Sequence, residues 1–460
     1  MKKLYLAHNT CLNSSYDLNV LEAGLVQKGY ELVSQPEDAD EVIYSGCSVR
    51  EKWVEDAISQ INEVARRAPN AEISITGCIA NTSMDKVQKG TSATNLSFKA
   101  MHQILMDKTE LRFSDVDDTH VQDYNVERKS DLPAGLQNLR LRVGEEKASI
   151  VASLQEIDRT YQSSSEDRYR RTTKGFVFYN EQDPFERITV TRSCPYKCTF
   201  CSIPKGRGEF TSVTLSSVLS KVREALEQGK YHIVLLGDEV GNYRSPDGGA
   251  DFPTLIENIL SLNPRIELSI RYIEPKPFQR YYSNIMSWSA NGRIRLLYLS
   301  VQSGSHNILK KMKRGYKLER LKKQLAYIRN STSVILYGNW LIGFPSESEK
   351  DFDETVSLVR NLNFHINVVI PFSAREGTPA YAMDEQLSTE IIDDRVKRLT
   401  EVVAEMKCND MRESLASVDV SISDNIIHRI RLAERSQYAN DQEESEPSRV
   451  MGNLIEVKIL

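Results

Sequence analysis

The chain has 460 residues, which is too long for one ordinary hydrophobic core and predicts two or three domains. Hydrophobic residues make up 40% and charged residues 27%, as in an average soluble globular protein, and the formal net charge is −5. This balance excludes a chain coated with positive charge, although a local basic patch could still bind nucleic acid. No apolar run is long enough for a membrane span, and early polar residues exclude a secretory leader, so we expect a cytoplasmic protein.

Residues 1–100 alternate between strand-like and helix-like segments. We expect strands at 3–7, 41–44 and 72–76, and helices at 17–28 and 51–67. Such alternation predicts an α/β domain, in which helices cover both faces of a parallel sheet.

The rest of the chain divides into three parts. Residues 101–185 are polar and charged, and we interpret them as an insert or linker. Residues 186–415 return to alternating strands and helices, in about six βα units, which predicts a full or partial βα barrel with its chemistry at the C-terminal ends of the strands. Residues 416–460 contain short strand-like segments, which predict a small all-β cap.

One group of cysteines has tight spacing. The chain has seven cysteines, and in a reducing compartment closely spaced ones more often bind metal or react than form disulfides. Cys194, Cys198 and Cys201 form a C-x3-C-x2-C loop after an expected strand. Three thiolates can bind three irons of a cubane iron–sulfur cluster and leave the fourth open. Zinc is the alternative, but structural zinc favours C-x2-C pairs with two further ligands, and no fourth ligand lies close in sequence.

A second group of cysteines is dispersed over the first domain. Cys11, Cys47 and Cys78 each follow the C-terminal end of an expected strand. In open α/β sheets that edge binds ligands, and a parallel sheet would bring the three turns together. Three buried core cysteines are the alternative. Each one, however, falls in a turn of small or polar residues, which a core cysteine does not require.

The barrel motif resembles the radical S-adenosylmethionine (SAM) superfamily. Over nearly the whole chain the sequence is similar to the methylthiotransferase family within it. The matching segments are Asn9–Ser14, Cys47–Lys52, Gly77–Ala80, Cys194–Gly208, Leu299–Ser305, Ile342–Pro345 and Phe372–Pro379.

The resemblance implies two [4Fe–4S] clusters, one on each group of three cysteines, and two molecules of SAM. One SAM would methylate a sulfur held at the N-terminal cluster. The other would bind the barrel cluster and supply a radical that abstracts hydrogen from an unactivated C–H bond. A sulfur donor and an external electron donor are then needed. The C-terminal segment would be a short copy of the family's RNA-associated TRAM domain.

Candidate SAM contacts lie on the cysteine loop, just after it, or at the ends of barrel strands. They are Phe200, Arg207, Gly237, Asp238, Glu239, Gln302 and Ser303. The alternatives are an ordinary strand-to-loop turn at Gly237–Glu239 and packing in the core for Phe200. Arg207 and Arg375 could contact anionic groups, or could form surface ion pairs.

The substrate has two interpretations. The Cys47–Lys52 segment resembles the branch that modifies the adenosine next to the anticodon in tRNA. A basic run supports RNA, unless it is only a solvated helix face: Lys310, Lys311, Lys313, Arg314, Lys317, Arg320, Lys322 and Lys323. Against RNA, the chain from residue 418 onward has five Lys/Arg and eight Asp/Glu. A peptide or protein side chain is therefore an alternative substrate, and a non-catalytic iron–sulfur protein that binds RNA is a third hypothesis.

Overall fold

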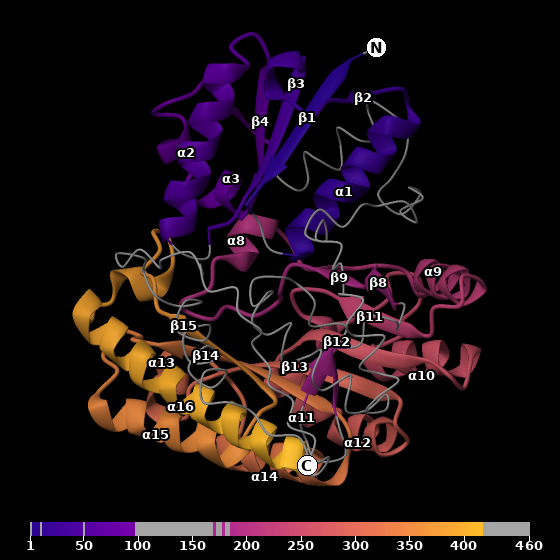
Figure 1. Ribbon diagram of the computed structural model, residues 1–460, viewed down its shortest axis with the longest axis vertical. Helices are drawn as coiled ribbons and strands as arrows, with labels where there is room; N and C mark the ends of the chain where they lie inside the picture. Colours follow the sequence, from indigo (N-terminus) through magenta and orange to yellow (C-terminus); the bar gives the residue numbers. More distant parts are fainter. Residues whose placement is uncertain are drawn as a thin grey trace.

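The computed structural model describes residues 2–9, 12–48, 51–96, 169–171, 177–179 and 185–416. Within them, an N-terminal α/β domain lies against the end of a larger α/β domain (Figure 1). No helix among the described residues has both the length and the apolar composition that a membrane crossing requires.

The N-terminal domain has a five-stranded, entirely parallel sheet in the order β2-β1-β3-β4-β5. Its strands are β1 (Lys3–His8), β2 (Glu31–Leu32), β3 (Glu41–Gly46), β4 (Glu72–Gly77) and β5 (Thr94–Asn95). Helices α1 (Leu12–Gln27) and α2 (Glu51–Arg67) lie on opposite sides of the sheet (Figure 1). Side chains that alternate along β3 explain this, because Ile43 packs with α1 and Tyr44 with α2. The predicted α/β architecture is confirmed.

The larger domain is built on a six-stranded sheet in the order β15-β14-β13-β12-β11-β8, also entirely parallel. The strands are β8 (Phe185–Thr189), β11 (His232–Leu236), β12 (Glu267–Ile273), β13 (Ile294–Gln302), β14 (Ile335–Ile342) and β15 (Ile366–Pro371). Neighbouring strands of this sheet follow one another along the chain, as in a partial βα barrel. Because all are parallel, their six C-terminal ends share one rim.

Helices cover the outer face of this sheet. They include α9 (Leu215–Glu227), α10 (Phe252–Leu262), α12 (Tyr282–Ala290), α14 (Leu318–Ser331), α15 (Glu349–Leu362) and α16 (Thr389–Ala416). Several begin where the sequence provides an N-cap: Thr214, Asp251 and Ser348 each accept a hydrogen bond from the backbone of the first turn. The opposite face carries a separate apolar cluster around Tyr298 and Tyr337.

The short elements were not expected from the sequence. Helices α3 (Cys78–Thr82), α8 (Ile203–Arg207), α11 (Pro275–Arg280) and α13 (His306–Lys311) are too short for an apolar periodicity to reveal them. Strands β6 (Tyr169–Arg171) and β7 (Val177–Tyr179) form an antiparallel pair inside the segment interpreted as a linker. The predicted C-terminal cap at 416–460 lies outside the described residues, apart from its first position in α16.

Candidate functional site

Two cysteines of the N-terminal domain lie at the same edge of the sheet. Cys47 follows β3, Cys78 follows β4, and the strands end on the paired residues Gly46 and Gly77. Gly77 has a φ of +77°, and a Cβ there would lie 2.6 Å from the carbonyl oxygen of Gly46. Glycine is therefore needed for the two backbones to approach so closely. The cysteines that follow are both buried.

Asn9 connects this edge to β1. Its side-chain oxygen accepts a hydrogen bond from the backbone N–H of Cys47 at 3.0 Å, and its amide donates to the Trp53 carbonyl at 2.8 Å. Its own backbone N–H donates to Ser45 at 3.2 Å. Cys11, two positions further along the chain, lies outside the described residues, so its place beside Cys47 and Cys78 stays a prediction.

The barrel cysteines occupy the loop between β9 (Thr191–Arg192) and α8, at the C-terminal rim. Ser193 starts the loop with a φ of +64°, and its backbone N–H donates to the Asp238 carboxylate at 2.8 Å. Further on, the hydroxyl of Thr199 donates to the Lys311 carbonyl at 3.0 Å. The Cys201 sulfur accepts from the backbone N–H of Ile203 at 3.4 Å. The loop is thus anchored at its start, its middle and its end.

The thiols of this loop fit an iron–sulfur cluster. All three are free, and burial raises the pKa of Cys201 to about 11 and that of Cys194 further still. Bound iron would supply the positive charge that thiolates need there. Among the described residues no three Cys, His, Asp or Glu side chains gather closely enough to hold a single metal ion. A cubane spreads its ligands over several irons and needs no such convergence.

The two cysteine groups approach one another where α3 packs on α8 (Figure 1). A Cβ at Gly206 of α8 would lie 3.1 Å from the sulfur of Cys78, the first residue of α3. The Asn81 amide donates to the Gly206 carbonyl at 2.8 Å. We call this contact, formed by residues 78–82 and 203–207, the α3–α8 seam.

Arg207 joins the two domains in a buried ion-pair network. Its guanidinium pairs with Asp17 of α1 at 2.7 Å and with Asp238 at 2.6 Å, and it donates to the Ser14 hydroxyl at 2.8 Å. Arg192 adds a second ion pair to Asp17 at 3.1 Å. The surface-ion-pair alternative for Arg207 is wrong, because its side chain is only 6% exposed. A contact of Arg207 with SAM stays a prediction.

The residues after β11 form a tightly bonded turn at the rim. A Cβ at Gly237 would lie 2.0 Å from the Thr191 hydroxyl oxygen, so no larger residue fits there. The Asp238 carboxylate accepts a hydrogen bond from the Ser193 backbone and forms an ion pair with Arg207, as described above. Burial raises the pKa of Glu239 to about 8, and its two oxygens accept backbone hydrogen bonds from Gly241 and Glu274 at 2.8 and 2.9 Å.

The remaining SAM candidates also lie at the rim or beside it. Gln302 ends β13 with a φ of +80° and is buried. The hydroxyl of Ser303 accepts from the Ser305 backbone at 3.1 Å and pairs with the Thr355 hydroxyl at 3.1 Å. Phe200 packs against the barrel core, which fits the core alternative without testing a contact with adenine.

The sequence analysis grouped Arg314 with a run of basic residues expected at the surface, and this is wrong because Arg314 is buried. Its side chain is 5% exposed and pairs with Glu274 at 3.3 Å. It also donates to the Cys198 sulfur at 3.3 Å and to the Ser300 carbonyl. No periodic signal could have revealed this, because Arg314 lies beyond the end of α13 and its partners are remote in the chain.

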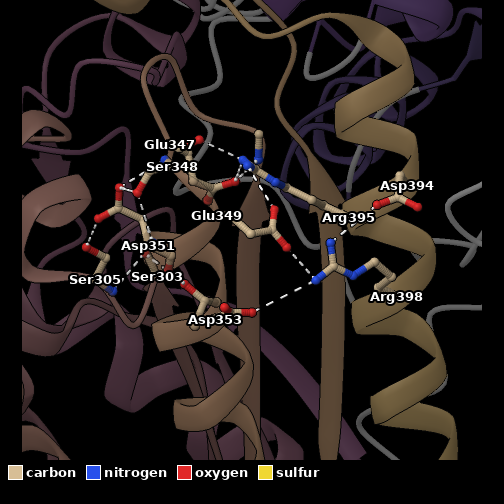
Figure 2. Close-up of polar contacts among 12 residues, drawn as sticks. Ser303, Ser305, Glu347, Ser348, Glu349, Asp351, Asp353, Asp394, Arg395 and Arg398 are labelled. Carbon is tan, nitrogen blue, oxygen red and sulfur yellow. Dashed lines mark hydrogen bonds and ion pairs between the residues drawn. The ribbon is translucent and has the colours of Figure 1, made fainter.

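A second missed group fixes the loop after β14 (Figure 2). The buried Glu347 accepts from the backbone N–H of Gly343 at 2.9 Å and pairs with Arg395 of α16 at 3.0 Å. Arg395 also reaches Glu349 at 3.2 Å, and Arg398 binds Glu349 from the next turn at 2.5 Å. The family-like segment Ile342–Pro345 is therefore held by residues just outside it.

Comparisons with known proteins agree with this geometry. The model of the radical SAM superfamily matches residues 188–359, and that of uncharacterized protein family UPF0004 matches residues 3–98. A tRNA-2-methylthio-N(6)-dimethylallyladenosine synthase of Bordetella petrii is 28% identical over 415 residues, covering 88% of this chain and 76% of the relative. The enzyme of that name from Roseobacter denitrificans is 25% identical over 467 residues, covering 100% of this chain and 96% of the relative.

A solved structure shares the fold. The radical SAM methyltransferase TsrM from Kitasatospora setae aligns with a TM-score of 0.51 at 16% identity, covering 83% of this chain and 75% of that one. The three-cysteine loop of the partial barrel lies within residues 188–359, the part that the radical SAM superfamily model matches. With the N-terminal match and the named relatives included, these comparisons support a radical SAM methylthiotransferase.

Proposed function

We propose that this enzyme inserts a methylthio group into tRNA, at the adenosine next to the anticodon. The relatives from Bordetella petrii and Roseobacter denitrificans carry names for that reaction on a dimethylallyl-adenosine. The observation that carries the proposal is the α3–α8 seam, where Cys78 touches the helix that follows the barrel cysteine loop. A reaction that needs a radical source and a sulfur site together requires such proximity.

The proposal includes two [4Fe–4S] clusters and SAM. The barrel thiols would hold one cluster, and Cys47 and Cys78, together with Cys11, would hold the other. When bound, these groups supply the radical and the methylated sulfur. An external electron donor and a sulfur donor complete the reaction, and the cytoplasm is the compartment that a tRNA substrate implies.

The chain's own residues would bind, orient and shield the reactants. Gly237 lets the turn after β11 pack against Thr191, and Glu239 after β11 and Gln302 at the end of β13 would face SAM at the rim. Arg314 fixes the Cys198 sulfur through its hydrogen bond. The ion pairs of Arg207 hold the N-terminal domain over the rim, and a closed interface keeps water from a radical.

The tRNA backbone would be bound by exposed cations beyond the barrel rim. Lys310, Lys313, Lys317, Arg320 and Lys323 are exposed, whereas Arg314 of the same run is buried. Exposed lysines and arginines bind phosphates by releasing counterions, and they carry no sequence information by themselves. Because the C-terminal segment is acidic, these exposed cations support an RNA substrate more strongly than that segment does.

The test uses full-length enzyme with both clusters reconstituted under anaerobic conditions. It is incubated with SAM, a strong reductant, sulfide and tRNA that lacks the methylthio group, and nucleoside digests are analysed by mass spectrometry. We expect a methylthio-adenosine that is absent with a Cys198→Ala variant. Methylthiolation of a peptide library, with none of tRNA, would identify a peptide or protein as the substrate. Cleavage of SAM without any methylthio product would refute the proposal.

A further inference from the structure

Arg375 lies in the loop after β15, beside the barrel cysteines. One terminal nitrogen donates to the hydroxyl of Ser202, the residue after Cys201, at 2.9 Å. Its Nε atom is buried and has no hydrogen-bond partner within the described part of the chain. Nearby, a Cβ at Gly377 would lie 2.6 Å from the Lys205 ammonium, so this loop packs closely on α8.

Arg375 lies beside the barrel cysteine loop and is attracted electrostatically to sulfurs from both groups of cysteines. Its partner Ser202 precedes α8, and α8 contacts Cys78 through Gly206. Electrostatic attraction follows the same pattern: burial lowers the pKa of Arg375, and attraction to Cys47, Cys201 and Cys78 opposes that change. One guanidinium therefore lies within electrostatic range of both proposed cluster sites.

The charge of Arg375 is not neutralised by an ion pair. Among the described residues no carboxylate lies within ion-pair distance of Arg375. Glu51 attracts it electrostatically, but that carboxylate is bound to Lys86 at 2.5 Å. Arg314, the other buried arginine beside the cysteine loop, differs in both respects. Its sulfur contact is with Cys198 of the barrel loop, and Glu274 pairs with it.

We propose that Arg375 sets the reduction potentials of both clusters by stabilising their reduced forms. The inference rests on the two-cluster part of the proposed function. One-electron reduction adds a negative charge to a cluster, and a cation without an ion pair beside the cysteine loop favours the state with that charge. Net charge and hydrogen bonds at the sulfurs are the ordinary means by which a protein adjusts such potentials. A single residue that reaches both sites would shift both potentials in one direction.

The experiment measures each cluster separately in full-length protein. A Cys194→Ala/Cys198→Ala/Cys201→Ala variant keeps the N-terminal cluster, and a Cys47→Ala/Cys78→Ala variant keeps the barrel cluster. Each is combined with Arg375→Met or Arg375→Lys, reconstituted anaerobically, assayed for iron and titrated redox-potentiometrically by electron paramagnetic resonance. We expect Arg375→Met to move both midpoint potentials to more negative values at unchanged iron content, and Arg375→Lys to restore most of each shift.

Arg314→Met is the matched control, because it removes a buried cation whose sulfur contact is with the barrel loop. It should move the potential of the barrel cluster alone. Unchanged potentials in Arg375→Met, or a shift at one cluster only, would overturn the inference. If Arg375→Met loses iron, Arg375→Gln is measured in its place, because glutamine keeps a hydrogen-bond donor without the charge. A midpoint potential in the Gln variant equal to that in the Lys variant would also overturn the inference. Shifted potentials in an enzyme that makes no methylthio-nucleoside would uphold the inference and refute the proposed substrate.

Discussion

Gly206 and Cys78 come from different domains and touch: a Cβ on Gly206 would stand 3.1 Å from the Cys78 sulfur. This separation is tighter than ordinary van der Waals contact, so any side chain at position 206 must push the two helices of the α3–α8 seam apart. The seam joins Cys78 to the helix that follows the barrel cysteine loop, so small displacements there should affect the transfer step first.

Substitution of Gly206 should separate radical formation from methylthio transfer. Gly206→Ala needs a shift of a few tenths of an ångström, and Gly206→Val needs more. We expect methylthio product to fall about tenfold or more in the Val variant and less in the Ala variant, because transfer depends on alignment. SAM cleavage to 5′-deoxyadenosine, measured in the same samples, should fall less.

Gly315→Ala is a suitable control for this series. Its Cβ would meet only the Lys276 side chain, at 3.7 Å, so no backbone has to move. Equal losses of 5′-deoxyadenosine and of methylthio product in Gly206→Val would contradict a role for the seam in alignment.

The buried carboxylate of Asp17 should contribute strongly to stability. Asp17→Ala removes the carboxylate that Arg192 and Arg207 share, and breaking a buried pair from one side costs about 3–5 kcal/mol. Urea unfolding under anaerobic conditions should show a lower free energy of unfolding. Arg360→Ala removes an ion pair that is half exposed and should change little. Equal effects of the two substitutions would show that the Asp17 network is no stronger than a surface pair.

Glu347 should make stability depend on pH. Burial raises its pKa in the folded protein to about 7, above the ordinary value of 4.5. Between these values the folded state binds more protons than the unfolded state, so stability from this group is present below pH 4.5 and lost as pH rises through 7. The Glu347→Gln variant does not lose this stability as pH rises. The difference between its free energy of unfolding and that of the wild type should therefore increase by about 1–3 kcal/mol from pH 5 to pH 8.

Glu405→Gln provides the comparison for this measurement. Glu405 is half exposed, and its replacement should give the same difference from wild type at both pH values. A Glu347→Gln difference that falls with pH would mean that the ion pair with Arg395 outweighs burial, and that the carboxylate titrates below its ordinary range.

The strands and most longer helices could be predicted from the sequence, whereas the contacts between domains could not. The helix at Glu51–Arg67 has the predicted ends, and the strand expected at 72–76 ends one residue later at Gly77, because apolar periodicity is a local property. The positions of Cys47 and Cys78 just after strand ends were predicted for the same reason, since both follow local strand signals. Arg207 and Asp17 are 190 positions apart, and Arg314 and Cys198 are 116 apart. Pairing over such separations is set by the packed fold, so the inward direction of Arg207 and Arg314 became visible only in three dimensions.

Charge reversal at the exposed lysines should weaken binding of tRNA. A Lys310→Glu/Lys313→Glu/Lys317→Glu variant replaces three exposed cations, so we expect KM for tRNA to rise about tenfold or more while kcat changes little. Because each bound phosphate releases counterions, the dependence of affinity on salt should also become shallower, by about one unit of the log–log slope for each phosphate that the variant no longer binds. SAM cleavage in the absence of tRNA is the internal control and should be preserved, since none of the three lysines is among the residues that we place at the cluster or SAM sites. An unchanged KM and salt dependence would place the RNA surface elsewhere, and would leave the same exposed cations without a role in substrate binding.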